Sequence, residues 1–123
     1  MTGETAKILI VDDDPASLTL SSQTLKRFGY THVDTYLDPV EAKTAFLEKA
    51  YDLFILDIRM PELSGFDLLD LLKQVSYPHK TIVLTAQAGD KTENEAYKKG
   101  VHAVLLKPYA ISDLVEAVKT ATE

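Results

Sequence analysis

Five short apolar runs, each followed along the chain by a longer amphipathic stretch, constrain the fold of this sequence more than any other feature. The runs occupy residues 8–11, 33–37, 53–56, 81–84 and 103–106. Four of them are continuously apolar or β-branched, which is typical of strands that are covered on both faces. The run at 33–37 is interrupted by Asp34 and Thr35, and this interruption indicates a strand at the edge of a sheet.

The stretches between the runs have helical spacing. Gly29 predicts the stop of the first helix, and Asp38 followed by Pro39 predicts the start of the second. Ser112 and Asp113 offer capping groups near the start of the last helix. The apolar residues expected on the buried helix faces are Leu18, Leu25 and Phe28; Ala42, Ala45 and Phe46; Phe66, Leu69, Leu72 and Val75; and Ile111, Leu114, Val115 and Val118.

Residues 90–99 are also compatible with a helix, but they offer only Ala96 and Tyr97 for burial. This predicts a loosely held helix that can move, and a simple solvated surface helix is an equally good interpretation. The fivefold alternation predicts a single α/β domain over residues 1–123, with an open parallel sheet and helices on both faces. Ligands of such sheets bind beyond the carboxyl ends of the strands.

Composition agrees with one globular domain and excludes several functions. The 123 residues are 46% hydrophobic and 26% charged, which excludes disorder. The lack of cysteine excludes disulfides and thiolate chemistry, and it suits a cytoplasmic location. The net charge of −6 argues against direct binding of nucleic acid. No apolar run approaches the roughly 18 residues of a membrane span.

Polar residues follow four of the five predicted strands, and a parallel sheet would bring them to one edge. They are Asp12, Asp13 and Asp14 after the first strand, Asp57 after the third, Thr85 after the fourth and Lys107 after the fifth. Asp14 precedes Pro15 and is most simply a helix cap. Thr85 or Lys107 alone would be weak evidence of a site, because threonine is common in strands and lysine is usually solvated.

Together these groups have the chemistry to handle a phosphoryl group. The adjacent carboxylates Asp12 and Asp13 repel each other, and a hard divalent cation relieves that repulsion. Asp57 closes an apolar run, where an unpaired charge costs free energy. Mg²⁺ held by the carboxylates would bridge to phosphate oxygens, while the Lys107 ammonium and the Thr85 hydroxyl stabilise negative charge. A free carboxylate such as Asp57 can be the nucleophile.

The residues at these strand ends resemble the receiver domain of two-component response regulators. The resemblance covers residues 7–120 and implies a flavodoxin-like sheet with strand order 2-1-3-4-5. The motifs that carry it are Ile8-Leu-Ile-Val-Asp12-Asp13-Asp14, Asp57-Ile-Arg-Met-Pro61-Glu-Leu-Ser-Gly65, Thr85-Ala86 and Lys107-Pro108.

The resemblance implies a phosphorylation site and a metal site. Asp57 would accept a phosphoryl group from a sensor histidine kinase or a phosphotransfer protein. Asp12, Asp13, Asp57 and the backbone carbonyl of Arg59 would bind Mg²⁺, for which Mn²⁺ can substitute. Lys107 would contact the phosphoryl oxygens, and the hydroxyl of Thr85 would bond to them once they are present.

The resemblance has further implications for single residues. The peptide between Lys107 and Pro108 is expected to be cis. Gly65 would permit a tight connection into the third helix. The side chains of Arg59 and Gln87 would border the phosphoryl site and alter the lifetime of the aspartyl phosphate.

One position departs from the pattern of many receivers, which carry an aromatic residue three positions before the lysine. This chain has Val104 there, so the usual coupling of threonine and aromatic residue cannot operate in its ordinary form. Tyr109 lies nearby in the sequence but is not an equivalent position.

A receiver would switch conformation on phosphorylation and regulate an output domain or protein through its fourth helix, fifth strand and fifth helix. A homodimer is among the assemblies that the resemblance allows. The chemistry on Asp57, including its intrinsic reversal, would be autocatalytic, so we do not expect a turnover enzyme.

Three alternatives compete with this interpretation. Asp12-x-Asp14 is similar to the aspartate pair of haloacid-dehalogenase-type phosphatases, but Ala16 stands where those enzymes usually carry threonine or valine. A flavin-binding module would share the sheet order, but three aspartates after the first strand would repel its phosphate. A receiver-fold scaffold that works without phosphorylation stays open, and Val104 is its only support in the sequence.

Overall fold

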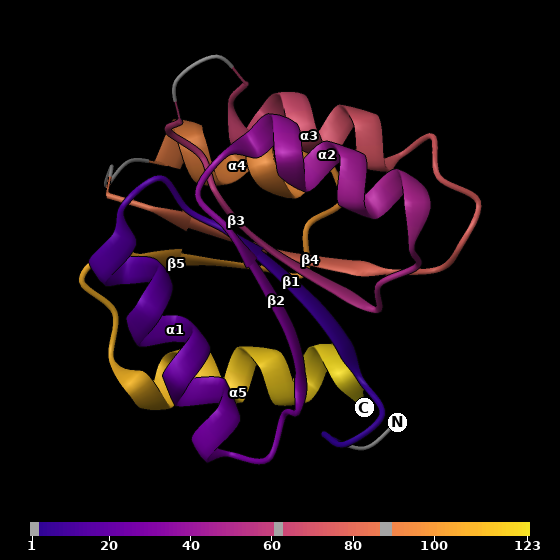
Figure 1. Cartoon of the computed structure of the whole chain (residues 1–123). Coiled ribbons are helices and arrows are strands. Elements are labelled where there is room, and N and C mark those ends of the chain that lie inside the picture. Colours follow the sequence, from indigo (N-terminus) through magenta and orange to yellow (C-terminus); the bar gives the residue numbers. More distant parts are fainter. Residues whose placement is uncertain (1–2, 61–62, 87–89) are drawn as a thin grey trace.

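The five apolar runs form one parallel sheet with the order β2-β1-β3-β4-β5, as the resemblance implied (Figure 1). The computed structural model describes residues 3–60, 63–86 and 90–123. Strand β2 lies at an edge of the sheet, which confirms the prediction from its polar interruption. The strands are β1 (Lys7–Val11), β2 (His32–Tyr36), β3 (Leu53–Asp57), β4 (Lys80–Thr85) and β5 (Ala103–Leu106).

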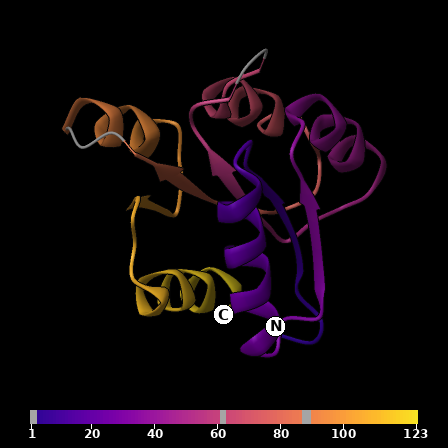
Figure 2. The same cartoon turned by 60° about the vertical axis from the view of Figure 1, so that its left-hand side comes forward.

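The predicted helices cover both faces of the sheet (Figures 1 and 2). Helices α2 (Pro39–Glu48), α3 (Gly65–Leu72) and α4 (Asp90–Lys98) lie on one side, and α1 (Pro15–Arg27) and α5 (Ile111–Thr122) lie on the other. Side chains of a strand alternate between the two layers. In β1, Leu9 and Val11 pack under α2 and α3, whereas Ile8 and Ile10 pack against α1 and α5.

The first two helices begin at the predicted caps. The side chain of Asp14 accepts a hydrogen bond from the Ala16 amide at 3.1 Å, and a proline occupies the first turn of the helix. Asp38 caps α2 in the same way through the Val40 amide, at 2.9 Å. Gly29, just beyond α1, has φ +95°, a conformation that glycine adopts without steric cost.

Capping at α5 differs from the expectation. The cap residue is Ala110, and no side chain caps the helix. Ser112 and Asp113 lie within the first turn, past the position from which a side chain can cap the free amides. The predicted capping role of these two residues is therefore wrong, although the Asp113 carboxylate still lies near the favourable positive end of the helix dipole.

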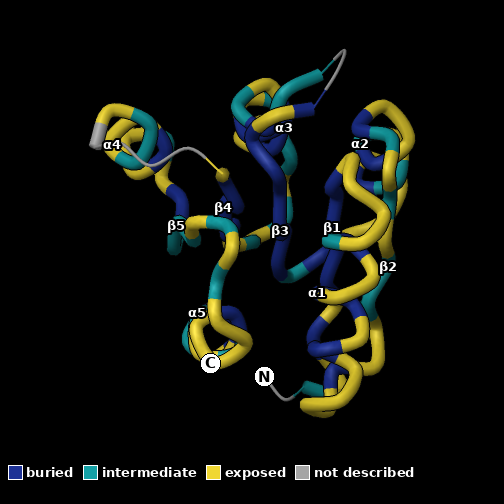
Figure 3. The backbone as a smooth tube through the Cα atoms, turned by 90° about the vertical axis from the view of Figure 1, so that its left-hand side faces the viewer, coloured by how far each residue is buried: buried dark blue, intermediate teal, exposed yellow. Residues whose placement is uncertain are grey.

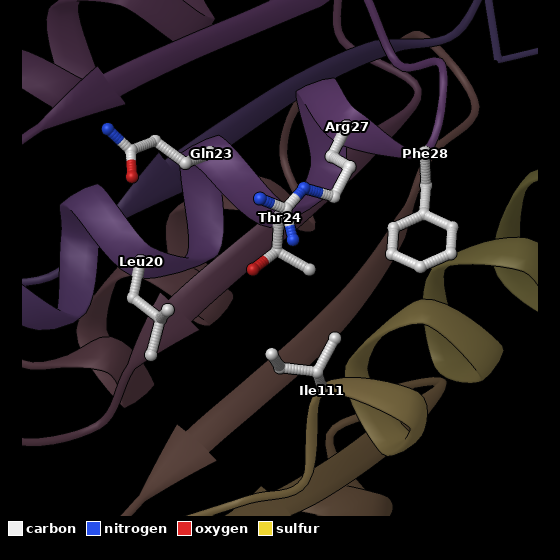
Figure 4. A pocket seen from close by; sticks show the side chains of 6 residues that line it. All are labelled: Leu20, Gln23, Thr24, Arg27, Phe28 and Ile111. Carbon is white, nitrogen blue, oxygen red and sulfur yellow. The ribbon is translucent and has the colours of Figure 1, made fainter.

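Three aromatic or aliphatic residues that were expected to be buried are exposed. Phe28 and Ile111 are 53% and 48% exposed, and they lie at the end of α1 and the start of α5. With Leu20 they line a small pocket of about 110 Å³ between the two helices (Figure 4). Tyr97 is 50% exposed, so α4 buries Ala96 but not its tyrosine. Figure 3 shows α4 mostly exposed, whereas β3 is buried along its length.

No helix in the described ranges is both long enough and apolar enough to cross a lipid bilayer.

Candidate functional site

Three aspartates meet at the carboxyl edge of the sheet. Asp57 is the last residue of β3, and the amide of Asp12, just beyond β1, bonds to the Tyr36 carbonyl of β2 at 3.1 Å. Each of Asp12, Asp13 and Asp57 offers a carboxylate oxygen, and these oxygens all lie within 4.8 Å of one another. Asp12 is completely buried, Asp57 is 7% exposed, and Asp13 faces solvent.

Lys107 joins two of these carboxylates. Its Nζ donates to Oδ2 of Asp12 at 2.7 Å and to Oδ2 of Asp57 at 3.2 Å. Its backbone amide bonds to the Thr85 carbonyl at 2.7 Å, which fixes the lysine at the end of β5. The peptide that joins Lys107 to Pro108 is cis, as the resemblance implied. Thr85 itself is buried at the end of β4, so Asp12, Asp13, Asp57, Thr85 and Lys107 all lie at this edge of the sheet, whereas the Asp14 side chain caps α1.

The loop after β3 is held close to Asp57. The Arg59 amide donates to Oδ1 of Asp57 at 3.2 Å, and the Gly65 amide donates to the Ile58 carbonyl at 2.9 Å. A Cβ atom on Gly65 would lie 2.5 Å from the Asp57 carbonyl oxygen and 2.8 Å from the Ile58 Cα. Only glycine fits this close approach of two backbone segments, which explains the tight connection expected from the sequence.

The side chains that were expected to border the phosphoryl site are only partly within the described structure. Arg59 is exposed and lines an open cavity of about 480 Å³ together with Asp13, Met60 and Ser64. Of the acidic cluster, Asp13 lines this cavity. Gln87 lies outside the described residues.

The pKa values of the two buried carboxyl groups, Asp12 and Asp57, shift in opposite directions. Burial and the neighbouring charge of Asp12 raise the pKa of Asp57 to about 6, against the attraction of Lys107. Burial also acts to raise the pKa of Asp12, but hydrogen bonds from Lys107 and Ser17 outweigh it and hold that pKa below its ordinary value. The pKa of Lys107 is raised by the same two carboxylates in spite of its burial.

The acidic cluster fits a hard divalent cation. Three carboxylate oxygens within 4.8 Å of one another provide the all-oxygen donors that Mg²⁺ takes, and Asp13 opens the cluster to solvent. A cation there would offset the repulsion from Asp12, which together with burial raises the pKa of Asp57.

One side-chain contact of this site was not predicted from the sequence. The Ser17 hydroxyl donates to Oδ2 of Asp12 at 2.6 Å. Since Asp14 caps α1, Ser17 is the third residue of the helix, from which side chains reach back toward the preceding loop. The predicted cap therefore contained the signal for this contact.

The region around Val104 also contains a contact that no motif predicted. Val104 packs on the face of the sheet that carries α4, whereas Tyr109 packs against the α1 and α5 layer. Tyr109 is thus on the opposite face and does not replace an aromatic residue at position 104. The hydroxyl of Tyr97, on α4, accepts a hydrogen bond from the Val104 amide at 3.3 Å.

Known proteins share both the sequence pattern and the fold. The family model for the response regulator receiver domain matches residues 8–119. The transcriptional regulatory protein ZraR of Klebsiella oxytoca is 34% identical over 108 residues, which cover 88% of this chain and 24% of ZraR. A probable chemotaxis protein CheY of Rhizobium etli is 30% identical and covers 94% of this chain and 92% of its own length.

Solved structures agree with these sequence matches. The solution structure of the beryllofluoride-activated NtrC4 receiver domain dimer superposes with a TM-score of 0.87 at 30% identity, and it covers 94% of each chain. This chain spans about a quarter of the length of the ZraR relative and nearly all of the CheY relative.

Proposed function

The chain belongs to the response regulator receiver domain family of two-component systems, and we propose that it accepts a phosphoryl group on Asp57 in a Mg²⁺-dependent reaction. Receiver domains act in phosphorelay signalling, pair with histidine kinases and output domains, and generally bind Mg²⁺ at an acidic pocket. The observation that carries the proposal is the bridge of Lys107 to both Asp12 and Asp57 beside a solvent-open third carboxylate.

The proposed reaction uses the groups at the end of the sheet. A carboxylate oxygen of Asp57 attacks the phosphorus of a phosphohistidine, the P–N bond breaks, and its electron pair returns to the imidazole of the donor. Mg²⁺, when bound to Asp12, Asp13, Asp57 and the Arg59 carbonyl, supplies positive charge that offsets the charge of the transferring group. Lys107 stabilises the remaining phosphoryl oxygens, and the Thr85 hydroxyl bonds to them in the product.

The partners follow from this role. The phosphodonor is a sensor histidine kinase or a phosphotransfer protein, and the response passes to an output domain or protein through α4, β5 and α5. A homodimer of the phosphorylated domain is compatible with this role. Because the acceptor is the protein's own carboxylate, the domain is not a turnover enzyme. Arg59, which lines the cavity together with Asp13, influences the lifetime of the aspartyl phosphate.

A scaffold that works without phosphorylation is the second candidate, and Val104 at the usual aromatic position is the observation that favours it. Such a scaffold would keep the fold of a receiver while its Asp57 stayed unmodified under phosphorylating conditions.

Incubation with acetyl phosphate and Mg²⁺, followed by intact-mass measurement, separates the two candidates. We expect the parent to gain the mass of one phosphoryl group, and Asp57→Asn to gain none, because the amide cannot act as the nucleophile. Asp52→Asn, which changes the aspartate before the other end of β3, is the matched control and should be modified like the parent. Absence of an adduct on the parent, or an adduct that survives Asp57→Asn, would contradict the proposal.

A further inference from the structure

Asp12 is the most enclosed carboxylate of the site, and its contacts come from the start of α1 and from Lys107 beyond β5. Its side chain is completely buried. Oδ1 accepts the Asp14 amide at 3.0 Å, whereas Oδ2 accepts both the Ser17 hydroxyl at 2.6 Å and Nζ of Lys107 at 2.7 Å. The orientation of this carboxylate is therefore set by its hydrogen bonds and not by solvent.

The hydroxyl of Ser17 is used differently from other helical hydroxyls of the chain. Those of Ser21, Thr44 and Thr122 donate to the carbonyl four residues earlier in their own helices, at 3.0, 3.3 and 2.9 Å. Such bonds are the usual local choice for serine and threonine in helices. Ser17 instead donates outside its helix, to a carboxylate of the acidic cluster. The structure thus couples the first turn of α1 directly to that cluster.

The two donors on Oδ2 of Asp12 differ in one respect that matters for function. Lys107 also bonds Asp57 and, in the proposed function, serves the phosphoryl oxygens, so its contact with Asp12 is shared. Its positive charge also opposes a nearby cation. The Ser17 hydroxyl is neutral and has no proposed contact with the phosphoryl oxygens. It can therefore keep the Asp12 carboxylate oriented when the Lys107 ammonium binds the phosphoryl group.

We infer that Ser17 is a positioning residue that orients Asp12 for binding Mg²⁺. This inference rests on the proposed function, since it assumes that the acidic cluster takes a divalent cation. Groups that hydrogen-bond a metal-ligating side chain typically contribute tenfold to a hundredfold to metal affinity. The hydroxyl matters here more than the bulk of the side chain.

Calorimetric titration with Mg²⁺ on the 123-residue chain tests the inference. We expect Ser17→Ala to bind Mg²⁺ about tenfold more weakly than the parent, and Ser17→Thr, which keeps a hydroxyl, to bind nearly as well as the parent. Ser17→Val, which has the shape of threonine without the hydroxyl, should bind as weakly as Ser17→Ala. Ser21→Ala is the matched control, because it removes a buried hydroxyl one turn further along α1 without touching Asp12.

A second readout distinguishes positioning from a general structural effect. In Ser17→Ala, the Mg²⁺ concentration for half-maximal phosphorylation by acetyl phosphate should rise about tenfold, while the rate at saturating Mg²⁺ stays close to that of the parent. Thermal unfolding in EDTA checks that every variant is folded.

The possible failures are distinguishable. If the parent binds Mg²⁺ and Ser17→Ala binds it equally well, or if Ser17→Thr and Ser17→Val lose affinity alike, the role of the hydroxyl is contradicted and the proposed function stands. If the parent itself binds no Mg²⁺, the proposed function is contradicted and this inference with it.

Discussion

At the scale of single residues, Asp12 and Asp57 show how two buried carboxyl groups of one pocket acquire different properties. Both bond Lys107, but Asp12 also accepts the Ser17 hydroxyl and the Asp14 amide. These contacts favour its charged form and hold its pKa low, while burial and the resulting charge of Asp12 raise the pKa of Asp57 to about 6. The nucleophile is thus mostly ionised near neutral pH, but at a cost in stability.

The raised pKa of Asp57 predicts how stability depends on pH in the metal-free protein. Because the pKa is about 6 in the folded state and 3.8 as the ordinary value, the folded state binds this proton more tightly than the unfolded state does. The stabilisation is complete below the ordinary value and is lost as the pH rises through the folded value. Asp57→Asn removes this loss, so it should be more stable than the parent near neutral pH by about 2–3 kcal/mol.

Urea unfolding of both proteins in EDTA, from about pH 4 to pH 8, measures this effect. The difference between Asp57→Asn and the parent should shrink as the pH falls below the folded pKa and the carboxyl group becomes neutral. A constant difference across this range would show that the carboxyl group does not titrate in the way the structure indicates.

At the scale of the elements, spacing and capping predicted the helices, and errors arose at their ends. Phe28 and Ile111 follow the apolar period of α1 and α5, but each lies at a terminus of its helix, where it is exposed and lines the pocket between the two helices (Figure 4). Period alone does not reveal where a partner surface stops, so residues such as these are assigned to the core. The capping prediction for Ser112 was wrong for a related reason. The helix begins two residues earlier than the prediction requires, and such a shift decides whether a side chain can cap it.

Among the described residues, helix α4 has few attachments to the rest of the fold, and the sequence predicted this from its small number of apolar residues. Ala96 is buried, Lys99 just after the helix bonds Asp70 of α3 at 2.9 Å, and the Tyr97 hydroxyl accepts the Val104 amide of β5 at 3.3 Å. The last contact depends on side-chain reach between two elements, which no pattern within either element encodes. It protects an amide on the edge strand beside α4.

Tyr97→Phe should therefore loosen the edge of β5 without unfolding the domain. The Val104 amide loses its acceptor, and a hydrogen bond worth about 1 kcal/mol corresponds to about fivefold faster amide exchange. Hydrogen exchange followed by NMR measures this directly, and the His102 amide, which bonds the Thr81 carbonyl at 2.7 Å, is the internal control. Equal acceleration at Val104 and His102 would indicate global destabilisation, and an unchanged Val104 rate would show that the hydroxyl gives no protection.

At the scale of the whole molecule, buried apolar residues pack on both faces of the sheet, and the sheet in turn positions the residues of the site. Parallel strands end on the same edge, so the alternation of runs and helices was sufficient to predict that Asp12, Asp57, Thr85 and Lys107 meet. The sequence could not predict which atoms are in contact. Ser17 and Lys107 both donate to Oδ2 of Asp12, and this depends on the exact positions of α1 and β5. The close approach at Gly65 likewise needs the positions of two backbone segments.

The distribution of charge over the molecule predicts a stability that depends on Mg²⁺. Three of the acids behind the net charge of −6 lie together at one edge, and Lys107 is the only basic side chain among the described residues that forms an ion pair with them. A cation that binds the folded state alone stabilises it by about 2.7 kcal/mol at a hundredfold excess over its dissociation constant. Urea unfolding in Mg²⁺ and in EDTA should differ by this amount for the parent and by much less for Asp13→Asn, which weakens the cluster. Sodium chloride at matched ionic strength separates binding from screening: if it stabilises the parent as much as Mg²⁺ does, the cluster acts only as a patch of repelling charge.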